Sequence, residues 1–134
     1  MSLDTQSYSP PVKVDHGSDV ADLNLSSSGE LIVRIACRRR ADGEVDGLQV
    51  SFPRVSEFRL LDEVTLATWW MSPGFKAGHH VLEVVGGGWG SELNNLQGYE
   101  VLRREWLLVT GNGCMSVISN EPPRLQDIVL PEDI

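Results

Sequence analysis

Two adjacent histidines, His79 and His80, are the residues whose type first suggests chemistry, because imidazole nitrogens bind zinc and other transition metals. Their spacing argues against a shared metal ion, since adjacent residues of a strand point to opposite faces. His16 lies in a polar N-terminal stretch, and Glu83 and Glu100 could complete a site only if the fold brought them together. The sequence therefore predicts surface histidines, with no metal site and no cofactor.

Residues 86–90 read Gly-Gly-Gly-Trp-Gly, a composition that phosphate-binding loops also use. The segment lacks the Lys-Ser/Thr pair of a P-loop and the G-x-G-x-x-G spacing of dinucleotide-binding folds. We therefore expect a mobile loop rather than a nucleotide site. Trp89 within it is either folded back onto the core or offered to a partner.

Residues that could act in catalysis each have a simpler structural explanation. The adjacent carboxylates of Asp62 and Glu63 could exchange protons, but helix capping and the helix dipole also explain them. Cys37 and Cys114 lie in strand-like apolar runs, which predicts buried, unreactive thiols. The alternative is a disulfide between neighbouring strands in an oxidising compartment. No serine lies in a G-x-S-x-G elbow, so we predict no catalytic residue and disfavour an enzyme.

Charge and composition limit the partners of this chain. Eleven Lys and Arg against nineteen Asp and Glu give a net charge of −8, which disfavours nucleic acid and favours a basic partner protein. The basic cluster 38–40 is followed by an acidic turn at 41–47, as in a solvated hairpin tip. No apolar run approaches the ~20 residues that cross a bilayer, and residues 1–11 lack a secretion signal. A cytoplasmic location without membrane contact is expected.

The first half of the chain predicts a flexible segment followed by strands. Residues 1–29 contain few large apolar groups and should form a flexible N-terminal segment, with a single domain over 30–134. Residues 31–37 and 48–52 alternate apolar and polar side chains and should pair as an antiparallel hairpin. Pro53 interrupts this ladder, and a bent or renewed strand follows over 55–61.

The elements that should border a pocket follow next. Asp62 can cap a short helix that contains Trp69 and Trp70 and ends at 72–74, where the sequence reads Ser-Pro-Gly. Residues 80–85 return to strand character, and 91–98 fit either a helical turn or a loop.

The C-terminal part carries the clearest structural signal. Two β-rich runs within 105–119 flank Gly111-Asn112-Gly113, which predicts a hairpin. Residues 106–109 are apolar on both faces and should form a central or covered strand. Residues 124–134 should pack loosely or fray. The predicted fold is α+β, a mostly antiparallel sheet with one or two short helices.

Two stretches also carry a family resemblance. The first reads Leu-Gln-Val-Ser-Phe over 48–52 and continues with Val55, Phe58-Arg59, Asp62-Glu63 and a tryptophan; the second contains residues 105–110, Cys114 and Pro122-Pro123. Together they look like a pattern of small uncharacterised bacterial proteins, some of which resemble polymorphic-toxin immunity proteins. The resemblance implies a small protein that neutralises a toxin by surface contact, often with carboxylates, and it assigns no site residue.

Two hypotheses of function follow. The first is a non-catalytic protein-binding module, for example an immunity-like inhibitor of a bacterial toxin, with Trp89, Glu83 and Glu92 as partner-binding residues. The alternative is a small-ligand-binding or enzymatic domain with a pocket between sheet and helix, bordered by Trp69 or Trp70 and by His79 or His80. A homodimer through strand edges or the helix face also remains open.

Overall fold

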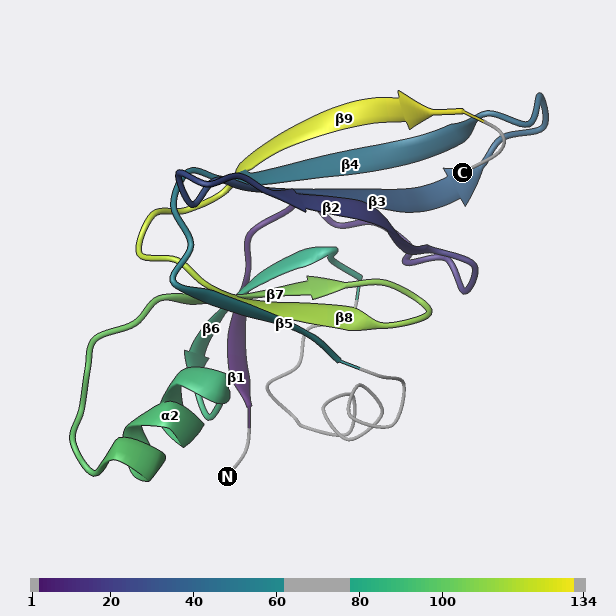
Figure 1. Ribbon diagram of the computed structural model, residues 1–134. Coiled ribbons are helices and arrows are strands. Elements are labelled where there is room, and N and C mark those ends of the chain that lie inside the picture. Colours follow the sequence, from purple (N-terminus) through teal and green to yellow (C-terminus); the bar gives the residue numbers. More distant parts are fainter. Residues whose placement is uncertain (1–2, 62–77, 132–134) are drawn as a thin grey trace.

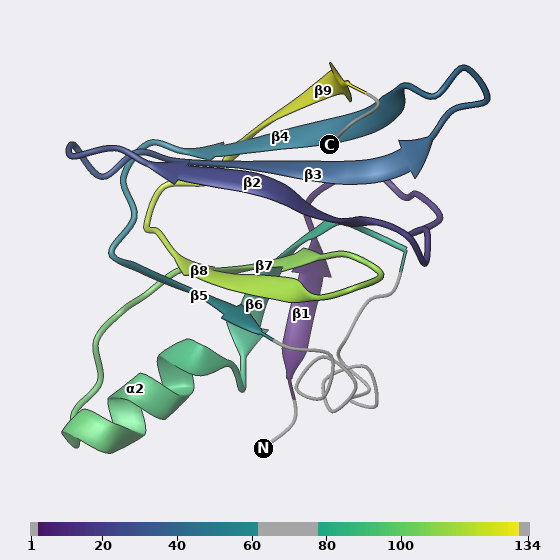
Figure 2. The ribbon, with the colours of Figure 1, turned by 45° about the vertical axis from the view of Figure 1, so that its right-hand side comes forward.

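The protein is built from two antiparallel sheets that lie face to face, and the computed structural model describes residues 3–61 and 78–131 of it (Figures 1 and 2). The first sheet has the strand order β1-β6-β7-β8-β5 and the second the order β2-β3-β4-β9. The strands are β1 (Asp4–Ser7), β2 (Asp19–Leu25), β3 (Leu31–Arg39), β4 (Val45–Phe52), β5 (Glu57–Leu61), β6 (Val81–Gly86), β7 (Glu105–Val109), β8 (Cys114–Ile118) and β9 (Arg124–Leu130).

Helix content is small. The one helix within the described ranges is α2 (Trp89–Gln97), which lies on the side of the first sheet that faces away from the second (Figures 1 and 2). The expectation of a mostly antiparallel α+β fold is confirmed at this level. The helix predicted to begin at Asp62, with Trp69 and Trp70, lies outside the described residues.

Both predicted hairpins are confirmed. Strands β3 and β4 pair with Val33 opposite Val50, so the alternating apolar residues of both strands share one buried face. Their turn is closed by the Arg40 amide, which donates to the Glu44 carbonyl oxygen at 2.7 Å. Strands β7 and β8 pair as the second hairpin, and its loop at 111–113 contains no residue with positive φ.

Pro53 marks a change of sheet. After β4 ends at Phe52, the Ser56 amide donates to the Ile118 carbonyl oxygen at 2.9 Å, and β5 then pairs with β8 of the first sheet. The renewed strand predicted after Pro53 is therefore present, but it belongs to the opposite layer.

The expectations for the two ends of the chain are wrong. Strand β1 pairs with β6, and β2 pairs with β3, so the segment 1–29 contains two edge strands rather than a flexible tail. Strand β9 pairs with β4 over seven residue pairs, so residues 124–130 do not fray. Edge strands bury only part of each face, and their weak apolar alternation concealed them.

The main core fills the space between the sheets around Trp106. Its side chain is fully buried, its indole N–H donates to the Ser119 carbonyl oxygen at 2.9 Å, and the Tyr8 ring meets it edge-on at 5.0 Å. The other face of the first sheet carries a smaller cluster that includes Leu107 and Val109. Strand β7 is therefore central and buried on both faces, which confirms the prediction from its composition.

Candidate functional site

Helix α2 is attached to the first sheet through a buried carboxylate. The Glu105 side chain on β7 accepts hydrogen bonds from the amides of Trp89 at 3.0 Å and Gly90 at 2.6 Å. These are free N–H groups of the first helical turn, and the cap residue Gly88 has no side chain to satisfy them. Glu105 therefore caps α2 from a neighbouring strand.

Burial changes the acidity of this carboxylate. Glu105 is 4% exposed, and desolvation raises its pKa, although the two amide donors and the Arg59 guanidinium oppose the shift. A raised carboxyl pKa is a property of general acids, but both oxygens of Glu105 hold the helix. The geometry therefore assigns this side chain an anchoring role.

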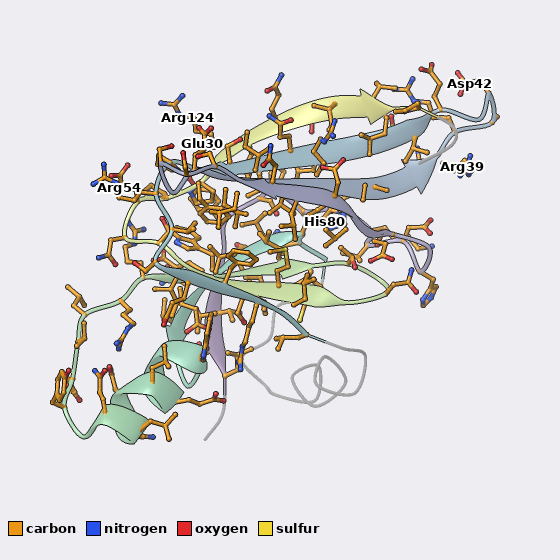
Figure 3. All side chains as sticks on the ribbon, in the orientation of Figure 1. Glu30, Arg39, Asp42, Arg54, His80 and Arg124 are labelled. Carbon is orange, nitrogen blue, oxygen red and sulfur yellow. The ribbon has the colours of Figure 1, made fainter. Side chains whose placement is uncertain are left out.

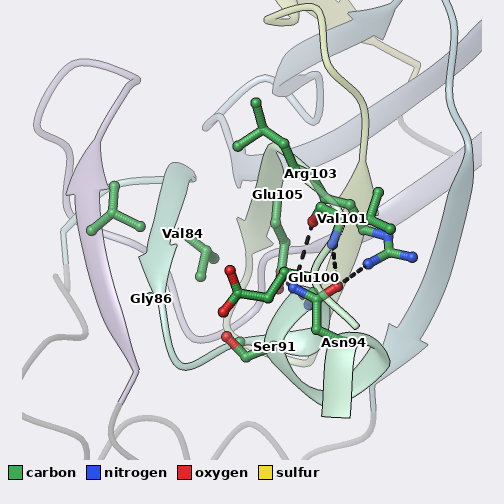
Figure 4. A pocket seen from close by; sticks show the side chains of 12 residues that line it. Val84, Gly86, Ser91, Asn94, Glu100, Val101, Arg103 and Glu105 are labelled. Carbon is green, nitrogen blue, oxygen red and sulfur yellow. Dashed lines mark hydrogen bonds between the residues drawn. The ribbon is translucent and has the colours of Figure 1, made fainter. Parts of the chain in front are cut away.

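A groove of about 450 Å³ lies between the end of β6, helix α2 and the segment that leads into β7 (Figure 4). Its polar lining includes Ser91, Asn94, Glu100, Arg103 and Glu105. In Figure 4 the Glu100 side chain reaches across the groove toward Ser91 and Gly86. None of the described residues that line it is a cysteine or a histidine.

Asn94 fixes the loop that follows α2. Its side-chain oxygen accepts hydrogen bonds from the Arg103 guanidinium and from the Val101 amide, the latter at 3.1 Å (Figure 4). Gly98 ends the helix at φ 79°, a left-handed conformation that favours glycine, and its amide donates to the Asn94 carbonyl oxygen. Asn94 thus ties the Val101 amide and the Arg103 side chain of this loop to the helix.

The apolar side chains of the same region are turned to solvent. Leu96 is 84% exposed, Tyr99 64% and Leu102 90%, and Val85 and Val101 are also exposed. We call Leu96, Tyr99, Val101 and Leu102 the α2 apolar surface, which excludes Val85 because that residue lies on the face of β6 that carries Glu83. None of the nine residues of α2 is buried, although an amphipathic helix normally covers its apolar stripe. Large apolar side chains exposed on a helix and on the loop that follows it are candidates for an interaction surface.

The structure brings together two of the three residues predicted to bind a partner. Trp89 is the half-buried first residue of α2, its ring 4.7 Å from the Arg59 guanidinium carbon, so it does not lie on a mobile loop. The exposed Glu92 carboxylate lies 3.8 Å from the same guanidinium. Glu83 instead accepts two hydrogen bonds from Arg104, at 3.0 and 3.2 Å, on the opposite face of the first sheet.

Both histidine side chains contact backbone carbonyl oxygens. His79 Nδ1 lies 2.8 Å from the Ser9 carbonyl oxygen, and His80 Nδ1 lies 2.7 Å from that of Val109. His80 is buried, contrary to the expected surface position. Across residues 3–61 and 78–131, no three His, Cys, Asp or Glu side chains are grouped to hold a metal ion.

The cysteines form no disulfide. Cys114 is buried, as predicted, whereas Cys37 is half-buried, and neither belongs to a disulfide. Burial, with smaller contributions from the Asp127 and Asp46 carboxylates, raises the pKa of the Cys37 thiol to about 11. A thiol with this pKa is protonated at neutral pH and is a poor nucleophile.

The α2 apolar surface was not foreseen from the sequence. Its residues Leu96, Tyr99, Val101 and Leu102 lie among polar residues, and the hydrophobic positions of this stretch show no clear period. No helix within the described part of the chain is long and apolar enough to cross a membrane. Comparisons with protein-family models, with curated proteins and with solved structures found no match.

Proposed function

We propose that the chain is a non-catalytic protein-binding module that docks a partner protein on the α2 apolar surface. The observation that carries this proposal is the exposure of Leu96, Tyr99 and Leu102 on a short helix without buried residues and on the loop after it. Helices shorter than about 12 residues are marginal in water by themselves, and a partner that covers α2 would stabilise it.

The groove beside this surface can accept a side chain of the partner. Interfaces gain most of their affinity from a few anchors that enter well-packed pockets. A partner side chain can enter the 450 Å³ groove while the rim leucines cover the surrounding contact. The proposed interface therefore combines an acceptor groove with an apolar rim.

Charge supports a basic partner. The exposed carboxylates of Glu92 and Glu100 flank the surface, and the chain carries a net charge of −8. The nearby Arg103 guanidinium is already bound by Asn94 and Gln97. Lysine or arginine beside an apolar anchor would complement this arrangement and speed association at low salt. An immunity-like role is one form of this function, and it predicts that the partner is a toxin whose activity falls when it is bound.

The test is affinity capture from the source organism with three forms of the protein: the unmodified chain, the double variant Leu96→Ser/Leu102→Ser, and the control Val129→Ser. Val129 is also exposed, at 49%, but lies on β9 of the second sheet. Each leucine is exposed in the free protein and would be buried in the complex, so its replacement by serine should weaken binding about tenfold or more.

The expected result is a partner retained by the unmodified chain and by the control but lost by the double variant. Equal capture by all three forms would contradict the proposal. If the protein itself is a dimer that the double variant converts to a monomer, the surface binds a second copy rather than another protein.

A further inference from the structure

A second cavity, of about 470 Å³, lies where the β1–β2 connection runs beside the second sheet. It shares no residue with the groove at α2. Its lining comprises Ser9, Pro10, Pro11 and Val12, residues Cys37, Asp46, Gly47 and Leu48 of β3 and β4, His80, and Leu125 and Asp127 of β9. This volume is within the range of small-molecule sites.

The cavity wall at residues 9–12 is held in place. The Ser9 hydroxyl oxygen accepts the Val81 amide at 2.9 Å, and the Val12 amide donates to the Gly78 carbonyl oxygen at 2.7 Å. Between them, Pro10 and Pro11 restrict the backbone and present apolar rings. A preformed wall lowers the entropy lost when a ligand binds.

The donors of this lining already have acceptors. The Cys37 thiol donates to the Ile35 carbonyl oxygen at 3.8 Å. His80 Nδ1 lies 2.7 Å from the Val109 carbonyl oxygen and donates to it, which leaves Nε2 of a neutral ring as an acceptor. Among residues 3–61 and 78–131, the buried His80 Nε2 has no hydrogen-bond partner. A buried polar atom without a partner is uncommon and indicates an unfilled role.

The charged groups of the lining are carboxylates. Asp46 pairs with Arg40 at 2.7 Å, and the Asp127 side chain is exposed at the cavity. Both carboxylates also act on Cys37, whose raised pKa reflects their negative potential as well as burial. The cavity lining therefore combines apolar side chains of Pro10, Pro11, Val12, Leu48 and Leu125 with the Asp127 carboxylate, which attracts positive charge.

We propose that this cavity binds a small organic ammonium ion, with its alkyl or aryl body between the prolines and the leucines and its ammonium group at Asp127. Such a molecule supplies hydrogen-bond donors and positive charge, which the free groups of the lining accept. A carboxylate of the same shape would meet Asp127 as a like charge and should bind more weakly than the ammonium.

The test is an NMR titration of the full chain, labelled with ¹⁵N, with 2-phenylethylammonium, neutral 2-phenylethanol and 3-phenylpropionate as probes. We expect saturable shifts at the amides of Val12, Cys37, Gly47 and Leu125. The ammonium should bind most tightly and the carboxylate least. Asp127→Asn should weaken ammonium binding about fivefold, the scale of an exposed ion pair, without weakening the alcohol.

Two further variants sharpen the result. Leu125→Trp should fill the cavity and abolish the shifts. Glu30→Gln should leave them unchanged, because Glu30 precedes β3 and does not line the cavity (Figure 3). Absence of saturable binding, equal binding of the carboxylate, or shifts confined to α2 would overturn the proposal. Because Asp127 is exposed, its variant keeps the test decisive even if Leu125→Trp does not fold.

Discussion

Gly88→Ala should detach α2 from the first sheet, because an added Cβ has no room there. The Cβ would lie 2.6 Å from Glu105 Oε2 and 2.8 Å from Val84 Cγ1, closer than carbon atoms approach such neighbours. The Gly88 backbone, at φ −100° and ψ −156°, is accessible to alanine, so the cost is steric rather than conformational.

The magnitude follows from two contributions. Overpacking costs about 1–3 kcal/mol, and a displaced Glu105 carboxylate loses hydrogen bonds to two amides, each worth about 1.5–3 kcal/mol when the acceptor is charged. Partial relaxation of Val84 and of the helix reduces the sum, so we expect a loss of about 3 kcal/mol in the free energy of unfolding. Urea denaturation followed by tryptophan fluorescence measures it.

Gly86→Ala is the matched control, since the nearest atom to its added Cβ, the Asp4 Cβ, lies 3.9 Å away. Its effect should stay within about 0.5 kcal/mol. In a Glu105→Ala background the cost of Gly88→Ala should shrink, because the carboxylate it strikes is gone. Equal effects of the two glycine substitutions, or an undiminished cost in that background, would refute the proposed packing of Glu105 against Gly88.

Three further predictions concern ionisation and the core. Burial raises the Glu105 pKa above its ordinary value of 4.5, so the stability it contributes is complete below that pH and is lost as the pH rises through the raised pKa. The stability of the unmodified chain relative to Glu105→Gln should therefore fall over this window in urea titrations; parallel pH profiles would contradict it. Alkylation of Cys37 by iodoacetamide, followed by mass spectrometry, should be slow at pH 8, and its rate should rise about tenfold per pH unit toward the thiol pKa of about 11. The rate should be higher in Asp127→Asn, because the variant removes a negative charge that raises this pKa. Reaction at neutral pH as fast as that of an unhindered cysteine would contradict the raised pKa. Trp106→Phe removes the hydrogen bond to Ser119 and leaves a cavity, for a loss of about 2–4 kcal/mol by denaturation, and a loss below about 1 kcal/mol would disagree with its central position.

The central strands could be predicted because their burial follows directly from residue type. In β3 and β4 alternate residues such as Leu31, Val33 and Val50 face the core, and period-two alternation is the direct record of a one-sided sheet. Strand β7 is covered on both faces and is correspondingly apolar throughout.

The edge strands and the sheet assignment could not be predicted in the same way. Strand β2 reads Asp-Val-Ala-Asp-Leu-Asn-Leu, whose half-buried residues carry little periodic signal. The alternation of β5 shows a strand but does not show whether it pairs in the first or the second sheet. That choice depends on long-range pairing with β8, which no local pattern records.

Less of the candidate site than of the fold could be predicted from the sequence. Trp89 and Glu92 were identified by residue type, and they do lie together at α2 through Arg59. The capping of α2 by Glu105 joins residues 15 and 16 positions apart, and only the fold reveals it. The exposure of Leu96 and Leu102 likewise depends on whether another part of the fold packs over them, which the sequence does not reveal.

Amide hydrogen exchange on the protein alone and in complex with its captured partner tests the docking surface most directly. A nine-residue helix without buried residues should exchange rapidly when free. The proposal predicts that exchange slows across residues 89–102 in the complex while β9 is unchanged. Protection elsewhere, with α2 still exchanging freely, would contradict it.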